Sequence, residues 1–259
     1  GCGYIGKMLG AALLADGIDV TGVVSSTESA ERLAGMRINP LVMDLDGDLG
    51  SLPFEKELEI FYMAPPPADG TFDPRMGRFI QALDELDHRP RVVYLSTTGV
   101  YGDCDGAWVD ESRPLNPQTD RARRRVDAEG QLLQWSQRSG GEAVILRVAG
   151  IYGPQRLPIH FLKSGGPVLQ DSSAPYSNRI HSQDLVTVCR AAMALAPSGE
   201  IYNVADGNPS SMADYMFKAA DYLGLPRPKE VDWETARQKM SPGMLSYLQE
   251  NRRICNTKM

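Results

Sequence analysis

Six short apolar runs alternate with helical patterns along most of this 259-residue chain. The runs are IDVTGVV (18–24), NPLVMD (39–44), LEIFYMA (58–64), RVVYLST (91–97), EAVILRV (142–148) and EIYNVAD (200–206). They are almost continuously apolar, as strands of a parallel sheet are when helices cover both of its faces. Helical patterns occupy residues 4–16, 73–88, 117–138, 182–196 and 210–223. This alternation predicts an α/β fold with a doubly wound parallel sheet and right-handed crossovers.

Two regions interrupt the alternation, residues 152–178 and 207–259, and both are rich in Pro, Gly, Ser and Met. We expect them to form a small C-terminal lobe over the carboxyl edge of the sheet, where ligands bind in folds of this class. The main domain is then expected to comprise residues 1–151 and 179–206. A chain of this length is long enough for one large domain with such an annex.

The composition argues against several classes of function. The net charge is −6 at pH 7, so no overall field draws the chain to nucleic acid or to an anionic membrane. Four scattered cysteines without a CxxC pair favour reduced thiols in a cytoplasmic protein. No apolar run approaches the roughly 18–20 residues that span a bilayer. Because the chain opens directly on a glycine turn, we expect a further segment to precede it in the full-length protein.

Three glycines open the chain in GCGYIG, at the spacing of a dinucleotide-binding turn. Gly1 would form the tight turn, Gly3 would let the backbone approach a pyrophosphate, and Gly6 would let the following helix pack closely. The N-terminus of that helix favours the phosphate charge. The motif alone is also compatible with an ordinary glycine turn before a helix, so its context has to decide.

The strand predicted at 18–24 is not followed by the acidic residue that would bind a ribose 2′-hydroxyl. Ser25 and Ser26 stand there instead, and the first acid is Glu28. Without a carboxylate a 2′-phosphate meets no repulsion, and the two hydroxyls could donate to it. Arg32 could reach the same place from the helix that follows. This pattern favours NADP as the cofactor, with NAD as the alternative.

Six further motifs follow in the order and at the spacings of a known family. They are MDLDG (43–47), YMAPPP (62–67), LSTTGVYGD (95–103), LRVAGIYGP (146–154), RIHSQDL (179–185) and YNVADG (202–207). With the glycine turn they resemble the extended short-chain dehydrogenase/reductase family, in its NAD-dependent epimerase/dehydratase group. The resemblance runs along the whole chain and implies a Rossmann fold that binds a nicotinamide dinucleotide.

The resemblance assigns roles to several residues. The family's Asp-Leu segment contacts adenine, which implicates Asp44 and Leu45. Ala64 and Pro65 stand where the family has small residues under the cofactor. Thr97 takes the place of the catalytic Ser or Thr.

Other polar residues in these motifs have structural interpretations as well. Tyr101 and Tyr152 fit half-buried packing positions with their hydroxyls at the rim. His181 and Asp184 fit a helix cap and a structural hydrogen bond, which we favour over catalysis. The three histidines lie far apart, and no His/Cys/Asp cluster has metal-ligand spacing, so no zinc site is expected.

The chain departs from the family at its catalytic pair, Tyr-x-x-x-Lys on the helix after the fifth strand. A glutamate commonly follows four residues beyond that lysine. Glu129 matches it, which puts Arg125 in the lysine position and Arg121 in the tyrosine position. Arg125 could still hold ribose hydroxyls, whereas Arg121 cannot exchange a proton near neutral pH. Arg121 could stabilise an oxyanion or bind a carboxylate or phosphate.

The arginines belong to NPQTDRARRRVDAEG (116–130), where Asn116 as N-cap and Pro117 at the first helical position predict a helix start. One interpretation is a solvated helix face. Its i,i+4 pairs would be Asp120–Arg124, Arg123–Asp127 and Arg125–Glu129. A nucleic-acid patch is disfavoured by the acidic chain. We prefer a third interpretation, with Arg121 and Arg125 at a cofactor cleft and Arg123 and Arg124 mostly outside it.

Taken together, the sequence predicts an NAD(P)-binding oxidoreductase or epimerase-like enzyme on a small polar substrate, anionic or nucleotide-linked substrates included. The predicted catalytic residues are Thr97, Tyr101, Arg121 and Arg125, with Tyr101 as the candidate acid/base. The predicted cofactor contacts are Gly1, Gly3, Tyr4, Ile5, Gly6, Ser25, Ser26, Asp44, Leu45, Ala64, Pro65 and Arg125. A non-catalytic dinucleotide-binding sensor or regulatory protein is the alternative. The resemblance also implies that a homodimer could form through the helices at 73–88 and 117–138.

Overall fold

The computed structural model describes residues 1–50, 52–53 and 58–259, which divide into two compact units. The first unit comprises Gly1–Thr97, Asp120–Arg147 and Gln183–Tyr202, and the second comprises Thr98–Thr119, Val148–Ser182 and Asn203–Met259. The second unit therefore contains both segments that the sequence predicts for the C-terminal lobe. It also takes in residues 98–119, which the sequence analysis assigned to the main domain.

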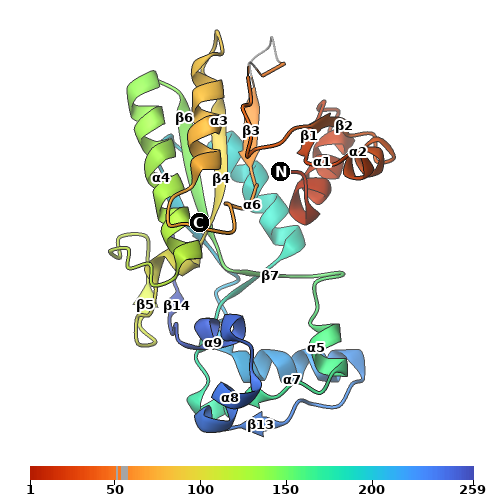
Figure 1. The fold of residues 1–259 in the computed structure, drawn as a ribbon, viewed down its shortest axis with the longest axis vertical. Helices are drawn as coiled ribbons and strands as arrows, with labels where there is room; N and C mark the ends of the chain where they lie inside the picture. The colour runs from red at the N-terminus through yellow and green to blue at the C-terminus, as the bar shows by residue number, and fades with distance from the viewer. Residues whose placement is uncertain (51, 54–57) are drawn as a thin grey trace. The chain divides into compact units, whose positions relative to one another are not determined.

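Helices and strands alternate along the first unit, as Figure 1 shows. Its elements are α1 (Tyr4–Ala15), β1 (Thr21–Val24), α2 (Thr27–Ala34), β2 (Asn39–Val42), β3 (Glu59–Tyr62), α3 (Pro74–Asp84), β4 (Arg91–Thr97), α4 (Asp120–Ser139), β6 (Glu142–Val148), α6 (Ser182–Leu195) and β11 (Ile201–Val204). Strands β4 and β6 coincide with their predicted runs, and the other four strands are shorter than predicted. Helix α2 is the helix on which the sequence analysis expected Arg32, although no bounds were predicted for it. Its start is marked by Ser26, whose hydroxyl accepts a hydrogen bond from the backbone N–H of Ser29.

Four strands form the central sheet in the order β11-β6-β4-β3, and β1 and β2 form a separate parallel pair. β3 and β4 are parallel, with Ile60 opposite Val92. The backbone N–H of Ile145 donates to Glu200 O at 3.0 Å, which joins β6 to the start of β11. The predicted α/β fold with a parallel central sheet is confirmed.

A hydrophobic core packs α3 and α4 against one face of this sheet. It joins residues of β3, β4 and β6 to both helices, and its buried members include Tyr62, Met76, Leu83, Tyr94, Leu132, Trp135 and Ile145. Side chains alternate along a strand, so Val93 and Leu95 of β4 are buried on the opposite face, where Figure 1 shows α6. No helix in the described part of the chain is long and apolar enough to cross a membrane.

Helix α4 begins at Asp120, so the predicted start at Asn116 and Pro117 is wrong. The backbone N–H of Asn116 donates instead to Val100 O at 3.1 Å. Asn116 O also lies so close to Gly102 that a Cβ at Gly102 would meet it at 2.1 Å. This contact fixes the segment before the helix in a non-helical path, which local capping signals do not reveal.

The second unit contains the 3-10 turn at Thr98–Tyr101 and many short elements. They are β5 (Trp108–Val109), β7 (Gly150–Tyr152), α5 (Ile159–Lys163), β8 (Val168–Leu169), a 3-10 turn at Asp171–Ser173, β9 (Tyr176–Ser177), β10 (Arg179–His181), β12 (Ser210–Ser211), α7 (Met212–Leu223), β13 (Glu230–Val231), α8 (Trp233–Lys239), α9 (Pro242–Leu248) and β14 (Arg253–Ile254). The strands form two-stranded pairs, such as β7 with β10 and β5 with β14.

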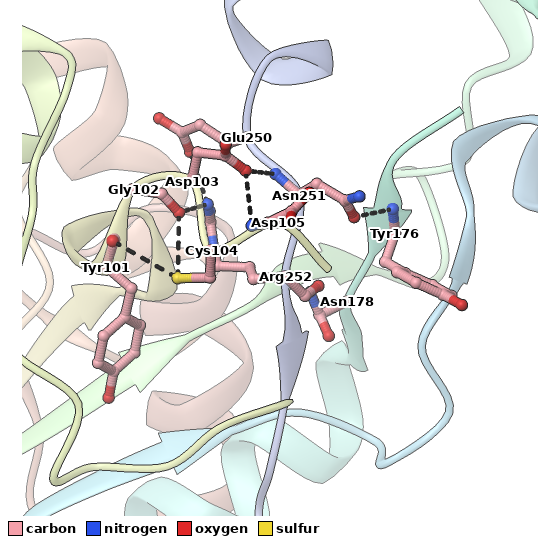
Figure 2. A network of polar contacts seen from close by, with 10 residues as sticks. All are labelled: Tyr101, Gly102, Asp103, Cys104, Asp105, Tyr176, Asn178, Glu250, Asn251 and Arg252. Carbon is pink, nitrogen blue, oxygen red and sulfur yellow. Dashed lines mark hydrogen bonds and ion pairs between the residues drawn. The ribbon is translucent and has the colours of Figure 1, made fainter. Parts of the chain in front are cut away.

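Polar contacts around Asn251 hold the C-terminal segment of the second unit in place (Figure 2). Asn251 O accepts backbone hydrogen bonds from Cys104 at 3.0 Å and Gly106 at 2.9 Å. Its own N–H donates to Asp103 Oδ1 at 2.9 Å, and its side chain accepts from Tyr176 N at 2.9 Å. The residues before β5 and those before β14 are thereby fixed to one another.

Candidate cofactor and active site

The glycine turn lies against the ends of two strands in the first unit. Cys2 N donates to Val23 O of β1 at 2.8 Å. A Cβ at Gly1 would lie 3.0 Å from the Cα of Ala64, the second residue after β3. A side chain at Gly1 would therefore crowd the backbone of Ala64. The turn and Ala64 thus lie at one edge of the unit. Their role as cofactor contacts stays a prediction.

The other two glycines differ in what surrounds them. A Cβ at Gly6 would lie 3.1 Å from Gly1 O, so the first turn of α1 packs closely on the glycine turn. A Cβ at Gly3 would meet nothing within 4 Å. Gly3 is the N-cap of α1, which has no side-chain capping bond and no acidic residue in its first turn. A helix N-terminus of this kind, open above a glycine, fits a phosphate group.

The serines after β1 form part of a small polar group on α2. Ser26 Oγ caps the helix and donates to Ser29 Oγ at 3.0 Å. Arg32 donates to the same Ser29 Oγ at 3.0 Å and pairs with Glu28 Oε1 at 2.6 Å. Ser25 is exposed beside them. The guanidinium that the sequence analysis considered for a 2′-phosphate is therefore linked to Ser26 through one intervening hydroxyl.

Arg75 of α3 connects the loops that follow β2 and β3. It forms a bidentate pair with Asp46, with Nε–Oδ1 at 2.7 Å and Nη2–Oδ2 at 2.5 Å. Its Nη1 donates to Pro65 O at 2.9 Å. Asp44 turns the first of these loops by accepting Asp46 N at 2.9 Å, and Leu45 packs on the hydrophobic core. The predicted contacts Asp44, Leu45 and Pro65 thus lie on loops that one arginine ties together.

Arg125 points into the first unit from α4. Its Nη1 donates to the Tyr94 hydroxyl at 3.0 Å, to Leu95 O at 3.2 Å and, as the longest contact, to Ala64 O at 3.5 Å. A single nitrogen therefore reaches the end of β4 and the loop after β3. The charge in the family's lysine position is held at the edge that also carries the glycine turn.

The other arginines of α4 have separate environments. Arg123 is exposed and pairs with Asp120 at 2.6 Å, as expected for a solvated position. Arg124 is buried and donates to Gly70 O, so the interpretation of this stretch as a solvated helix face is wrong for Arg124. Its place outside the cofactor cleft stays a prediction. Arg121 is half-buried, one helical turn before Arg125 on the same face. Asp127 also differs from the predicted i,i+4 pairing, since it accepts hydrogen bonds from Asp73 N at 2.7 Å and Gln131 at 2.6 Å.

Thr97 is half-buried at the carboxyl end of β4, next to a buried polar cluster. The cluster consists of Ser96, Glu129 and Arg147, and Glu129 accepts the Ser96 hydroxyl. Arg147 Nη2 lies 2.8 Å from Glu129 Oε2, and both side chains are almost fully buried. This pairing replaces the predicted bond between Glu129 and Arg125. It also anchors α4 to the strand end that carries Thr97.

Tyr101 belongs to the second unit and is only 1% exposed. Its hydroxyl donates to Asn203 Oδ1 at 2.7 Å. Asn203 is itself buried, and its amide donates to Val109 O at 3.3 Å and Cys255 O at 3.2 Å. These bonds favour a packing role for Tyr101. The predicted half-buried position with the hydroxyl at the rim is wrong for Tyr101, because the whole side chain is buried. Its predicted catalytic role stays a prediction.

Known proteins resemble this chain in both sequence and structure. Residues 76–205 match the model of the NAD dependent epimerase/dehydratase family. The chain is 32% identical to Protein YeeZ of Escherichia coli K12, across 99% of this chain and 91% of that protein. The chain belongs to the NAD dependent epimerase/dehydratase family.

Two solved structures extend the comparison. A functionally unknown conserved protein from Silicibacter pomeroyi has a TM-score of 0.83 and 32% identity, covering 100% of this chain and 88% of that one. The NAD complex of UDP-glucose 4-epimerase from Thermus thermophilus has a TM-score of 0.71 at 19% identity, covering 89% and 83%. The second likeness shows that this member of the epimerase/dehydratase family shares a fold with an enzyme solved with NAD.

Sequence reasoning missed a group of buried polar residues beneath the family's catalytic helix. Asp73 caps α3 by accepting Arg75 N at 3.1 Å and Met76 N at 3.2 Å. Its Oδ2 and the Tyr62 hydroxyl are buried without a hydrogen-bond partner among the described residues. Burial raises the pKa of Asp73, of Tyr62, and of Tyr94, the last to about 12. For Asp73 the sequence did carry a signal, because an Asp directly before Pro74 is typical of a helix N-cap.

Metal ligation has no support in the part of the chain that the structure describes. Those residues contain no group of three or more His, Cys, Asp or Glu side chains placed to hold a metal ion. The four cysteines are free thiols.

Proposed function

We propose that this protein is an NAD(P)-binding epimerase/dehydratase-like oxidoreductase that acts on a small polar substrate, anionic or nucleotide-linked substrates included. One observation carries the proposal: the glycine turn, Ala64 and Arg125 lie at the same edge of the first unit. A nicotinamide dinucleotide, when bound, supplies the hydride acceptor or donor that such chemistry needs. Family membership and the NAD complexes of its structural neighbours support the same conclusion.

Different residues of the first unit would bind different parts of the dinucleotide. The turn from Gly1 to Gly6, with Tyr4 and Ile5 in the first helical turn, would receive the pyrophosphate. Asp44 and Leu45 would contact adenine, and Ala64 and Pro65 would lie under the cofactor. Arg125 would hold the nicotinamide ribose with the guanidinium nitrogens that do not bond to Tyr94 and Leu95. Its three acceptors fix the side chain before any ligand arrives, which lowers the entropic cost of binding.

NADP is the proposed preference over NAD. Ser25, Ser26 and Arg32 would receive a 2′-phosphate, and the Arg32–Glu28 pair is exposed, so it can be exchanged at low cost. Because Glu28 also repels a phosphate, the preference should be modest.

The reaction itself requires a proton donor that Arg121 cannot be. We assign Thr97 to the reacting oxygen and Arg121 to the negative charge that develops on it or on the substrate. Tyr101 remains the candidate acid/base, although its hydroxyl already donates to Asn203.

A turnover assay tests these assignments. Full-length protein is incubated with NADPH or NADH and a panel of small carbonyl compounds and nucleotide sugars, and cofactor oxidation and sugar products are followed. We expect turnover that falls in Thr97→Ala and Arg121→Met but persists in Arg123→Met, the exposed neighbour on the same helix. Absence of turnover in every combination would contradict catalysis and leave dinucleotide binding as the only activity. Where the wild type does turn over, an unchanged rate in Tyr101→Phe would contradict the assignment of Tyr101 as the acid/base.

Three finer proposals accompany this function. The free thiols fit a reducing cytoplasmic setting. The negative net charge makes nucleic acid and anionic membranes poor partners. A homodimer through α3 and α4 is tested by sedimentation of the full-length protein.

A further inference from the structure

Asp73 is a buried carboxylic acid residue in the first unit that forms no ion pair with any described residue. The residue is only 1% exposed. Its Oδ1 caps α3 by accepting the N–H groups of Arg75 and Met76, whereas its Oδ2 is buried without a partner among the described residues. Burying a charge is costly unless it is paired and fully hydrogen-bonded. Capping alone does not account for the acid, because Asn and Ser cap helices without a charge.

Two side chains of α4 hold the backbone of Asp73 in place. Its N–H donates to Asp127 Oδ2 at 2.7 Å, and its carbonyl oxygen accepts a hydrogen bond from Gln131 Nε2 at 3.2 Å. Together with the two cap bonds on Oδ1, these contacts fix the residue from both helices. The carboxyl group of Asp73 therefore has a defined position under α4.

Arg125 is a half-buried cation of the same unit whose acceptors are neutral. Its Nη1 bonds to the Tyr94 hydroxyl, Leu95 O and Ala64 O, and it forms no ion pair in the part of the chain that the structure describes. The Tyr94 ring packs edge-on against Tyr62, with ring centres 5.8 Å apart. Both tyrosines belong to the core that α3 and α4 close over the sheet.

The charges of Asp73 and Arg125 act on each other through this core. Burial raises the pKa of Asp73, while hydrogen bonding from Met76 N, the positive charge of Arg125 and then Arg75 oppose the rise. Arg75 is already neutralised by its two hydrogen bonds to Asp46. Arg125 is therefore the cation whose charge is left for Asp73 to balance.

We propose that Asp73 is a positioning residue that balances the charge of Arg125 and thereby allows the site to accept the oxidised dinucleotide. The inference rests on the proposed function, in which Arg125 holds the nicotinamide ribose. The nicotinamide ring is positively charged in the oxidised cofactor and neutral in the reduced one. An unbalanced guanidinium beside it disfavours the oxidised form, and a buried carboxylate in the same core reduces that repulsion.

The affinities for the two forms of the cofactor test this role. Calorimetry with the full-length protein near neutral pH gives the dissociation constants of NADP⁺ and NADPH, and of NAD⁺ and NADH. Asp73→Asn should raise the ratio of the oxidised to the reduced constant about threefold or more, because only the oxidised ring loses a charge attraction. Asp73→Ser, a second uncharged cap, should do the same. A smaller folded fraction cannot imitate this result, since it weakens both forms equally.

Two further variants separate charge from packing. Tyr62→Phe removes a buried hydroxyl without a partner among the described residues and changes no charge. Asp84→Asn removes a carboxylate at the other end of α3, where it pairs with Arg138 at 2.6 Å. Both variants should keep the wild-type ratio. A wild-type ratio in Asp73→Asn and Asp73→Ser would overturn the role of Asp73 alone, whereas a wild type that binds no dinucleotide would contradict the proposed function as well.

An NMR titration tests the charge coupling without any ligand. The signal of the Asp73 carboxyl carbon is followed against pH in the wild type, Arg125→Met and Arg125→Lys. The titratable and charged groups around Asp73 are Arg75 with its partner Asp46, Arg125, Asp127, Tyr62 and Tyr94.

The pKa of Asp73 should rise in Arg125→Met, which loses the opposing charge, and stay near the wild-type value in Arg125→Lys. An unchanged pKa in Arg125→Met would overturn the proposal. So would an Asp73 that remains protonated at neutral pH, because it would then carry no charge.

Discussion

Glu129 and Arg147 form an ion pair inside the first unit, with Oε2 and Nη2 2.8 Å apart and side chains only 3% and 4% exposed. Arg147 Nε also lies 3.3 Å from Oε1 and 3.2 Å from Oε2. The pair bonds α4 to the end of β6, and the Ser96 hydroxyl extends it to β4. The helix that carries Arg121 and Arg125 is therefore fixed to the sheet by a charge that water does not reach.

Breaking this pair should destabilise the protein strongly. Glu129→Gln removes the carboxylate that pairs with the buried Arg147, and breaking a buried ion pair in this way typically costs about 3–5 kcal/mol in the free energy of unfolding. Urea unfolding of the variant measures the loss. As a control, Asp221→Asn breaks the exposed Arg227–Asp221 pair, which should cost at most about 1 kcal/mol. Equal losses in the two variants would contradict the buried role of Glu129.

Asp73 should make the stability of the protein depend on pH. Burial raises its pKa, while hydrogen bonds from Met76 N and Arg75 N oppose the rise. Since the folded state holds this proton more tightly than the unfolded chain, the free energy of unfolding falls as pH rises from about 4, the pKa of an unfolded Asp, through the folded pKa. Asp73→Asn retains a capping oxygen but does not titrate. The unfolding free energy of Asp73→Asn minus that of the wild type should therefore increase between pH 4 and pH 7. A difference that does not depend on pH would refute the assignment.

Gly102 should tolerate no side chain. Its φ is +65°, and a Cβ would approach Asn116 O to 2.1 Å. Gly102→Ala should therefore lose far more stability than Gly140→Ala, where φ is +77° and nothing lies within 4 Å. At Gly140 only backbone strain opposes the alanine, so Gly140→Ala should lose about 1 kcal/mol of stability. Thermal unfolding of both variants checks the comparison, and a Gly102→Ala protein as stable as Gly140→Ala would show that the contact can relax freely.

Restoring the family's catalytic pair should increase proton transfer. Arg121→Tyr with Arg125→Lys returns a group that can exchange a proton beside a cation, and acid–base catalysis is worth about 100-fold or more in favourable cases. We expect carbonyl reduction by the double variant to exceed that of the wild type by about tenfold or more. The matched control is Arg121→Phe with Arg125→Lys, which has the ring but no hydroxyl. Equal rates for the two double variants would show that the hydroxyl is not placed to react.

The sequence was most informative where structure is local. The apolar runs at 91–97 and 142–148 are strands over their full predicted length, because residues buried on both faces leave a continuous apolar signal. The helix start at Asn116 failed for a non-local reason, since its N–H is bonded to Val100 O. Capping rules describe only the neighbouring turn, and they cannot detect such competition.

In the candidate site, too, features set by local sequence were predicted and features set by distant contacts were missed. The glycine spacing and the register set by Glu129 identified the positions of the turn and of Arg125. The burial of Arg124 was missed, because its acceptor Gly70 O lies 54 residues away in sequence. Glu129 was paired with Arg125 on helical spacing, yet a buried arginine 18 residues away competes successfully for it. Charge pairing by i,i+4 spacing is a surface rule, whereas one face of this helix, with Arg124 and Glu129 on it, is buried.

Dinucleotide binding by the full-length protein tests the central claim most directly. Calorimetric titration with NADPH and NADH should give a dissociation constant of about micromolar for at least one of them. Gly3→Val should abolish this binding by filling the space above α1, whereas Gly130→Val, at another glycine with nothing within 4 Å, should not. Saturable binding lost only in Gly3→Val is the predicted result. No binding of either cofactor, or unchanged binding in Gly3→Val, would contradict the account.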